Sequence, residues 1–208
     1  MTEPRTGFGP GRPAVMIEGS ISIADATAVA EGRASPMLTP EVAERISAAH
    51  ERLQRCIGDN RLVYGITTGF GPLANRITAP EDIESLQRNL IYHLATGVGD
   101  LADWRAARMI VLARLSSIAQ GVSGASPDLV ARLISLLDSP FAPCIPMKGT
   151  VGASGDLTPL SHFALALMGE GGFIVCNTVS EATSLPLQSM KPPSPISAKA
   201  KCESGVRS

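Results

Sequence analysis

Apolar residues recur at helical spacing along most of the chain and predict a mainly α-helical protein. The clearest case begins with Thr39 as the N-cap and Pro40 at the first helical position. Its apolar stripe comprises Val42, Ile46, Ala49 and Leu53. Comparable patterns predict helices within residues 21–34, 79–99, 103–121, 126–139 and 157–172. The helix at 126–139 repeats the same start with Ser126 and Pro127, and 103–121 is apolar nearly all round, so it should be buried.

Two glycine-rich segments interrupt this helical pattern. In RLVYGITTGFGPLAN (residues 61–75), a short β-prone run breaks into a loop with several glycines and a proline. In GTVGASGDLTPLSH (residues 149–162), small residues crowd around Ser154 directly before a predicted helix. Glycine-rich turns before helices often serve backbone geometry alone, and that remains the alternative to a chemical role.

Composition and charge narrow the classes of function. The 208 residues carry a net charge of −1 and are 44% hydrophobic, which indicates a globular protein without a basic face for nucleic acid. No apolar run reaches the roughly 18 residues that a membrane span requires. The four cysteines form no Cys-x-x-Cys pair, so we expect reduced thiols in a cytoplasmic protein and no metal site. These are Cys56, Cys144, Cys176 and Cys202.

The chain divides into three parts by composition. Residues 1–14 lack the apolar stretch of a signal peptide and are predicted to be a flexible leader. Residues 15–173 carry the helices and both glycine-rich loops. Residues 174–208 are rich in Ser and Pro, contain no aromatic residue, and are predicted to be a disordered or frameshifted tail.

Ser154 lacks the surroundings of a conventional catalytic serine. Asp156 stands where the Gly-x-Ser-x-Gly pattern of a nucleophile elbow requires glycine. A phosphate-binding loop would end in Gly-Lys-Ser/Thr, which is absent. His50, His93 and His162 stand at no spacing typical of a serine triad, and His162 is interpreted as structural.

A different role suits the triplet Ala153-Ser154-Gly155. Attack of the Gly155 backbone nitrogen on the carbonyl carbon of Ala153 would close a five-membered ring. Glycine provides an unhindered nitrogen, and alanine leaves the carbonyl accessible. Dehydration of Ser154 would leave an exocyclic methylidene, an electrophile made from the chain itself. The N-terminus of the following helix would stabilise negative charge that develops there.

Both loops resemble motifs of one known family. GTVGASGDLTPLSH resembles the cofactor-forming motif of the aromatic amino acid ammonia-lyases, and VYGITTGFGPLAN resembles the loop that holds their catalytic tyrosine. The resemblance covers residues 15–173. It implies that Tyr64 is the catalytic base and that Ala153-Ser154-Gly155 becomes a 4-methylidene-imidazol-5-one, with no external cofactor or metal. It also implies a fumarase/aspartase-like helical fold and a homotetramer.

The resemblance also bears on the substrate, which it implies is a small aromatic amino acid. His93 and Leu94 fall at the pair of positions that distinguishes the substrates of the family. By this resemblance, histidine lyases have Ser-His at the pair, phenylalanine lyases Phe-Leu, and tyrosine lyases His-Leu. Because a histidine can hydrogen-bond a phenolic hydroxyl, the first expectation is conversion of tyrosine to trans-p-coumarate and ammonia. Gly71 would let the backbone approach the substrate. A histidine lyase or an aminomutase is the alternative.

Family members are more than twice as long as this chain. The downstream Asn, Tyr, Gln and Arg positions that complete their sites have no counterpart here. The resemblance therefore implies the N-terminal portion of a lyase, and an inactive fragment is the second hypothesis. Without its bundle partners, the helix at 105–119 is expected to expose apolar surface.

Overall fold

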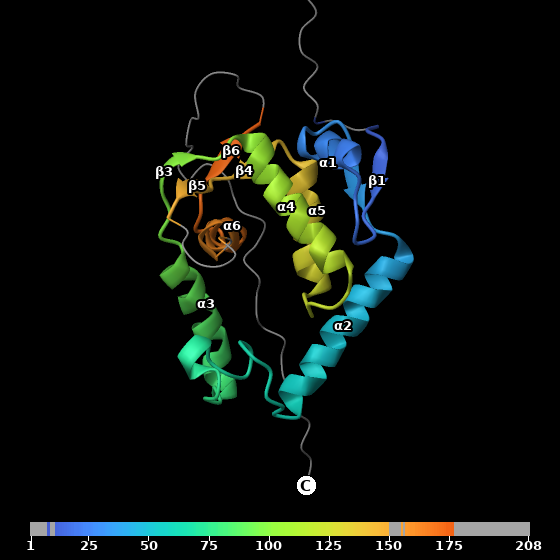
Figure 1. Cartoon of the computed structure of the whole chain (residues 1–208). Coiled ribbons are helices and arrows are strands. Elements are labelled where there is room, and N and C mark those ends of the chain that lie inside the picture. The colour runs from blue at the N-terminus through green and yellow to red at the C-terminus, as the bar shows by residue number, and fades with distance from the viewer. Residues whose placement is uncertain (1–7, 9–10, 150–154, 156, 177–208) are drawn as a thin grey trace, which may run out of the picture.

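The computed structural model describes residues 8, 11–149, 155 and 157–176, and these residues form a mainly helical fold. Helices α4 and α5 lie side by side at its centre, with α1 on one flank and α6 on the other (Figure 1). Helices α2 and α3 diverge, and the segment between them joins their lower ends (Figure 1). The helices are α1 Ile23–Ala30, α2 Pro40–Gly58, α3 Ile83–Leu94, α4 Trp104–Ala119, α5 Pro127–Asp138 and α6 Leu157–Met168. The helices that periodicity predicts are thus all present.

Short strand pairs connect the ends of these helices. The parallel pair is β1 Ala14–Met16 with β2 Ser35–Met37. The antiparallel pairs are β3 Val98–Leu101 with β5 Pro146–Lys148, and β4 Phe141–Pro143 with β6 Phe173–Val175. Single 3-10 turns, η1 Gly71–Leu73 and η2 Pro80–Asp82, lie between α2 and α3. The strands therefore tie distant segments together, and the helices supply most of the core.

The two predicted helix starts are confirmed. The hydroxyl of Thr39 accepts from the Val42 N–H at 3.3 Å, and that of Ser126 accepts from the Leu129 N–H at 3.2 Å. Each satisfies a backbone donor that the first helical turn leaves unpaired, and Pro40 and Pro127 follow where no donor is needed. A local chemical rule is therefore enough to place both starts.

Helix α4 forms the centre of the core but is not buried all round. Its covered face includes Val111, Leu112 and Leu115, which are inaccessible to solvent. In contrast to the expectation from its composition, Ala113, Arg114 and Ser117 are exposed. The difference arises because α1, α2 and α5 cover only part of the circumference of α4.

A buried arginine joins the ends of three elements in this core. Arg108 of α4 is fully buried and donates to backbone carbonyls at the end of α1, at the end of α5 and in β4. The acceptors are Val29, Ala30, Leu136, Leu137, Ser139 and Phe141. The carbonyls at the last turn of a helix lack partners within it, so one guanidinium satisfies several of them. Burial lowers the pKa of Arg108 from its ordinary value.

The fold extends beyond both ends of the segment predicted to carry the helices, residues 15–173. Phe8, predicted to lie in a flexible leader, packs with its ring centre 4.6 Å from the Arg108 guanidinium carbon. Arg12, from the same leader, donates to the Asp138 carboxylate at 3.0 Å. At the other end, Ile174 and Cys176 are buried, because β6 pairs with β4. The fold thus continues past residue 173, and residues 177–208 lie outside the described residues.

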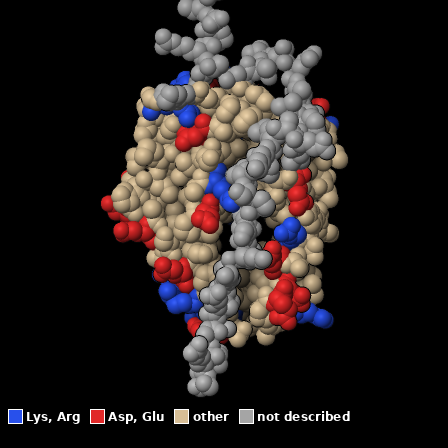
Figure 2. Space-filling view, turned by 180° about the vertical axis from the view of Figure 1, so that it is seen from behind, with Lys and Arg blue, Asp and Glu red and all other residues tan. Residues whose placement is uncertain are grey.

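Charges of both signs are interspersed over the face seen in Figure 2, wherever described residues form it. Within the described chain, no helix combines the length and the apolar character needed to cross a membrane. Cys56, Cys144 and Cys176 are free thiols, and Cys202 lies outside the described residues. Burial raises the pKa of Cys144, and raises that of Cys176 against the opposing effect of Arg108.

Candidate active site

The first glycine-rich loop presents Tyr64 at the surface. The Gly71 N–H donates to the phenolic oxygen of Tyr64 at 3.2 Å, and the Phe70 ring lies edge-to-face with the tyrosine ring at 6.2 Å between centres. Gly71 has a φ of +54°, in the region that favours glycine. Tyr64 is 65% exposed and lies in a turn, so it does not pack into the core. The structure thus brings two predicted site residues, Tyr64 and Gly71, into direct contact.

Two buried threonines hold the peptide groups on either side of Tyr64. The Thr67 hydroxyl accepts from the Val63 N–H at 2.8 Å and donates to the Arg61 carbonyl at 2.7 Å. The Thr68 hydroxyl accepts from the Gly65 N–H at 3.2 Å. Both threonines are buried, at 6% and 3% exposure, so these bonds are shielded from water. Sequence reasoning missed them, although paired hydroxyl residues inside a glycine-rich loop are a recognisable signal.

Helix α3 connects this loop to the second one. The Gln87 side-chain amide donates to the Gly65 carbonyl, which anchors the tyrosine loop to the N-terminal half of α3. His93 and Leu94 lie at the C-terminal end of the same helix, about 9 Å further along its axis by the rise per residue. His93 is exposed and Leu94 is half-buried. Among the described residues, His93 has no hydrogen-bond partner that would fix its ring.

The second loop begins at a close contact beside the end of α3. Gly149 packs on Gly97 so tightly that a Cβ on Gly149 would lie 2.9 Å from the Gly97 Cα. The Thr158 hydroxyl of α6 donates to the Gly149 carbonyl at 3.2 Å, and His162 of α6 accepts from the Gly97 N–H at 2.9 Å. The segment after His93-Leu94 and the start of the loop are therefore both fixed to α6.

The predicted cofactor triplet is only partly described. Ala153 and Ser154 lie outside the described residues. Gly155 has a φ of +69°, a conformation that a side chain would disfavour, and it stands two positions before the first residue of α6. This conformation fits the requirement for an unhindered nitrogen at position 155, and it gives glycine there a backbone reason as well.

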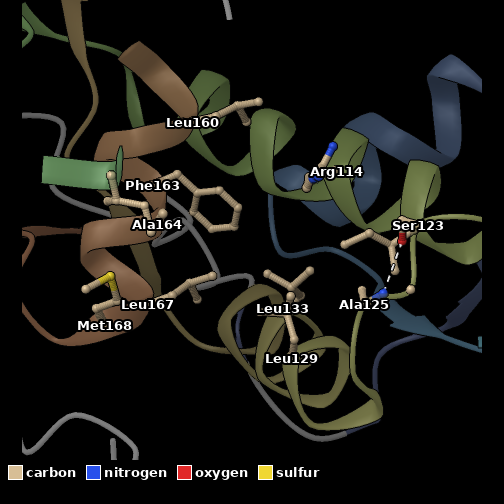
Figure 3. A pocket seen from close by; sticks show the side chains of 13 residues that line it. Arg114, Ser123, Ala125, Leu129, Leu133, Leu160, Phe163, Ala164, Leu167 and Met168 are labelled. Atoms are coloured by element: carbon tan, nitrogen blue, oxygen red, sulfur yellow. Dashed lines mark hydrogen bonds between the residues drawn. The ribbon is translucent and has the colours of Figure 1, made fainter. Parts of the chain in front are cut away.

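An apolar cavity of about 450 Å³ lies apart from these residues. Phe163 and Leu167 of α6 point toward Leu133 and Leu129 of α5 across it (Figure 3). Arg114 and Ser123 are among the few polar residues at its wall, and none of the predicted site residues lines it. Ile118 of α4 also lines the cavity but is only 2% exposed, so the apolar surface that residues 105–119 are expected to expose is not found there.

Comparison with known proteins identifies the same family that the two loop motifs resemble. The family model described as aromatic amino acid lyase matches residues 21–200. The chain belongs to the aromatic amino acid lyase family. The resemblance inferred from the two motifs is thereby confirmed, and so is the expected fold class.

Individual relatives cover several activities. The chain is 54% identical over 167 residues to tyrosine ammonia-lyase from Cereibacter sphaeroides, covering 80% of this chain and 32% of that protein. It is 41% identical over 150 residues to histidine ammonia-lyase from Psychromonas ingrahamii, covering 72% and 29%. Among solved structures, tyrosine aminomutase from Streptomyces globisporus superposes with a TM-score of 0.75 at 31% identity, covering 85% and 32%. The chain spans about a third of the length of the curated relatives that it matches.

Proposed function

We propose that the protein is an ammonia-lyase that deaminates an aromatic L-amino acid, with tyrosine as the preferred substrate and trans-p-coumarate and ammonia as products. The observation that carries the proposal is the His93-Leu94 pair at the end of α3, beside the start of the Ala-Ser-Gly loop. The 54% identity to a tyrosine ammonia-lyase supports the same substrate. A cytoplasmic homotetramer is part of this proposal.

The electrophile comes from the chain. The Gly155 nitrogen bonds to the Ala153 carbonyl carbon, whose oxygen leaves as water, and Ser154 loses its hydroxyl as a second water. The resulting methylidene-imidazolone supplies the electrophile that engages the substrate through its amine or its ring. The N-terminus of α6, which follows Gly155 closely, favours negative charge at this place.

Tyr64 serves as the base. Its phenolate oxygen takes the β-proton of the substrate, the Cα–N bond breaks, and the amino group leaves as ammonia while the double bond forms. The Gly71 N–H fixes the position of that oxygen, and Thr67, Thr68 and Gln87 fix the backbone that carries it. His93 would hydrogen-bond the substrate hydroxyl, so phenylalanine would leave that partner unpaired.

The proposal is tested on the purified chain by intact mass and by absorbance assays with tyrosine, phenylalanine and histidine. We expect a mass about 36 Da below the sequence mass, from the loss of two waters, and product formation fastest with tyrosine. Ser154→Ala should show the unshifted mass and no product. Faster formation of urocanate from histidine would favour the histidine lyase, which the 41% identity keeps as second candidate. An unshifted wild-type mass would identify a chain without the electrophile and support the inactive fragment.

A further inference from the structure

His162 is a half-buried link between the two halves of the candidate site. Its Nε2 accepts from the Gly97 N–H at 2.9 Å, although the two residues are 65 positions apart. Gly97 stands three positions after Leu94 and touches Gly149, where the second loop begins. One imidazole on α6 therefore controls a backbone group that lies between the predicted substrate pair and the cofactor loop.

We propose that His162 is a positioning residue for the cofactor loop. Its neutral imidazole fixes Gly97 and, through Gly97, the start of the loop that carries Ala153-Ser154-Gly155. An effect of His162 on catalysis rests on the proposed function. Its structural part can be tested separately.

The hydrogen bond defines the protonation state that this role requires. A nitrogen that accepts from a backbone N–H carries no proton, so the single ring proton of His162 resides on Nδ1. Protonation of Nε2 would set one donor against another and break the link. The imidazole must therefore stay neutral for Gly97 to be held.

The surroundings of His162 favour the neutral form. Burial lowers the pKa of His162, and no charged side chain of the described residues contributes to that shift. Helix α6 packs against α3, β4 and β5. Their ionisable residues are Glu84, Arg88, Tyr92, His93 and Lys148, with none in β4.

Steric constraints make the link specific to this pair of glycines. A Cβ on Gly97 would lie 2.8 Å from His162 Nε2 and 3.0 Å from the Pro146 Cβ. Gly149 has a φ of +123°, which disfavours any side chain. Thr158, one helical turn before His162 and 5% exposed, holds the Gly149 carbonyl from the same face of α6. The two α6 side chains thus clamp two glycines that touch each other.

Paired variants distinguish positioning from simple packing. His162→Gln retains a neutral acceptor, whereas His162→Leu removes it and leaves an apolar side chain. The control is His50→Leu, because His50 also bonds a backbone group, the Gly124 carbonyl at 3.0 Å, but lies on α2. Circular dichroism checks that each variant is folded. Ring closure is followed by intact mass after synthesis, and imidazole and amide signals by ¹⁵N NMR.

We expect ring closure in His162→Leu to be about tenfold slower than in wild type, with His162→Gln and His50→Leu close to the wild-type rate. The NMR spectrum should show His162 protonated at Nδ1, and the Gly97 and Gly149 amide signals should move in the Leu variant but not in the Gln variant. Equal closure rates in the Leu and Gln variants, or a proton on Nε2, would overturn the proposal.

The two proposals fail in different ways. If the wild-type chain keeps its full mass, the proposed function fails for this chain while the amide signals still decide whether His162 holds Gly97 and Gly149. Unmoved Gly149 signals in the Leu variant would then refute the positioning role. If the wild type closes its ring and all variants do so equally fast, only the role of His162 is lost.

Discussion

The helices α4 and α3 represent two differently built regions of the same chain. Eight residues of α4 are buried, including the charged Arg108, whereas α3 has no buried residue among the twelve it contains. The region around α4 covers its apolar positions with α1, α2 and α5, but α3 and the tyrosine loop leave Tyr64 and His93 open to solvent. Stability is thus concentrated in one region, and the candidate chemistry in the other.

The low burial of α3 and the tyrosine loop indicates where the candidate site lacks an enclosing wall. Small-molecule sites enclose most of their ligand, and a tyrosine side chain at 65% exposure has no enclosing wall among the described residues. The relatives that the chain matches are about three times as long. The described residues therefore supply groups that would face a substrate, and further protein surface would be needed to surround it.

The largest expected effect comes from the buried arginine. Arg108→Met keeps an apolar stem but leaves the carbonyls at the ends of α1 and α5 without their donor, so we expect a loss of about 3–5 kcal/mol in the free energy of unfolding. Arg114→Met is the matched control, because Arg114 is on the same helix but exposed, and should change stability by less than about 0.5 kcal/mol. Urea denaturation of both variants measures the difference. Equal losses would contradict the contrast between the two faces of α4.

An intermediate effect is expected in the tyrosine loop. Thr68→Val leaves the buried Gly65 N–H without an acceptor, which should cost about 1–3 kcal/mol in local or global stability. Thr68→Ser keeps the hydroxyl and removes only a methyl group, so it should cost about 1 kcal/mol or less. Hydrogen exchange of the Gly65 amide, measured alongside urea denaturation, should be faster in the Val variant than in the Ser variant. The same exchange rate in both would show that the hydroxyl does not hold this loop.

The features that the sequence predicts well are those set by neighbouring residues. The start of α2 at Thr39-Pro40 and that of α5 at Ser126-Pro127 follow from capping chemistry within one helical turn. The position of the first glycine-rich loop follows from glycine itself, and most of the second lies outside the described residues. The β-prone run before Tyr64 forms no strand and leads into a turn at residues 64–67, because the Thr67 hydroxyl satisfies the Val63 N–H and the Arg61 carbonyl locally.

The features that could not be predicted from the sequence depend on residues far apart in the chain. Phe8 and Arg12 become part of the fold through partners that include Arg108 and Asp138, about a hundred or more residues away. His162 contacts a backbone group, which no residue pattern reveals. The roles of Tyr64 and Ser154 rest on the resemblance to the family and remain predictions, since position alone does not establish chemistry.

The smallest expected effect lies at His162, where α6 meets the end of the open helix α3. Because burial lowers the pKa of His162 in the folded state, the unfolded state binds a proton at higher pH than the folded state does. The corresponding stability is complete above the ordinary histidine pKa of about 6.5 and is lost as pH falls through the lowered folded value. His162→Gln removes this titration, so its stability should fall less than that of wild type between neutral and mildly acidic pH. His50→Gln controls for the general acid response, because His50 lies on α2 and bonds the Gly124 carbonyl, away from the contact of α6 with Gly97. If wild type and His162→Gln lose stability in parallel over this range, the neutral imidazole is not what joins α6 to the open half of the molecule.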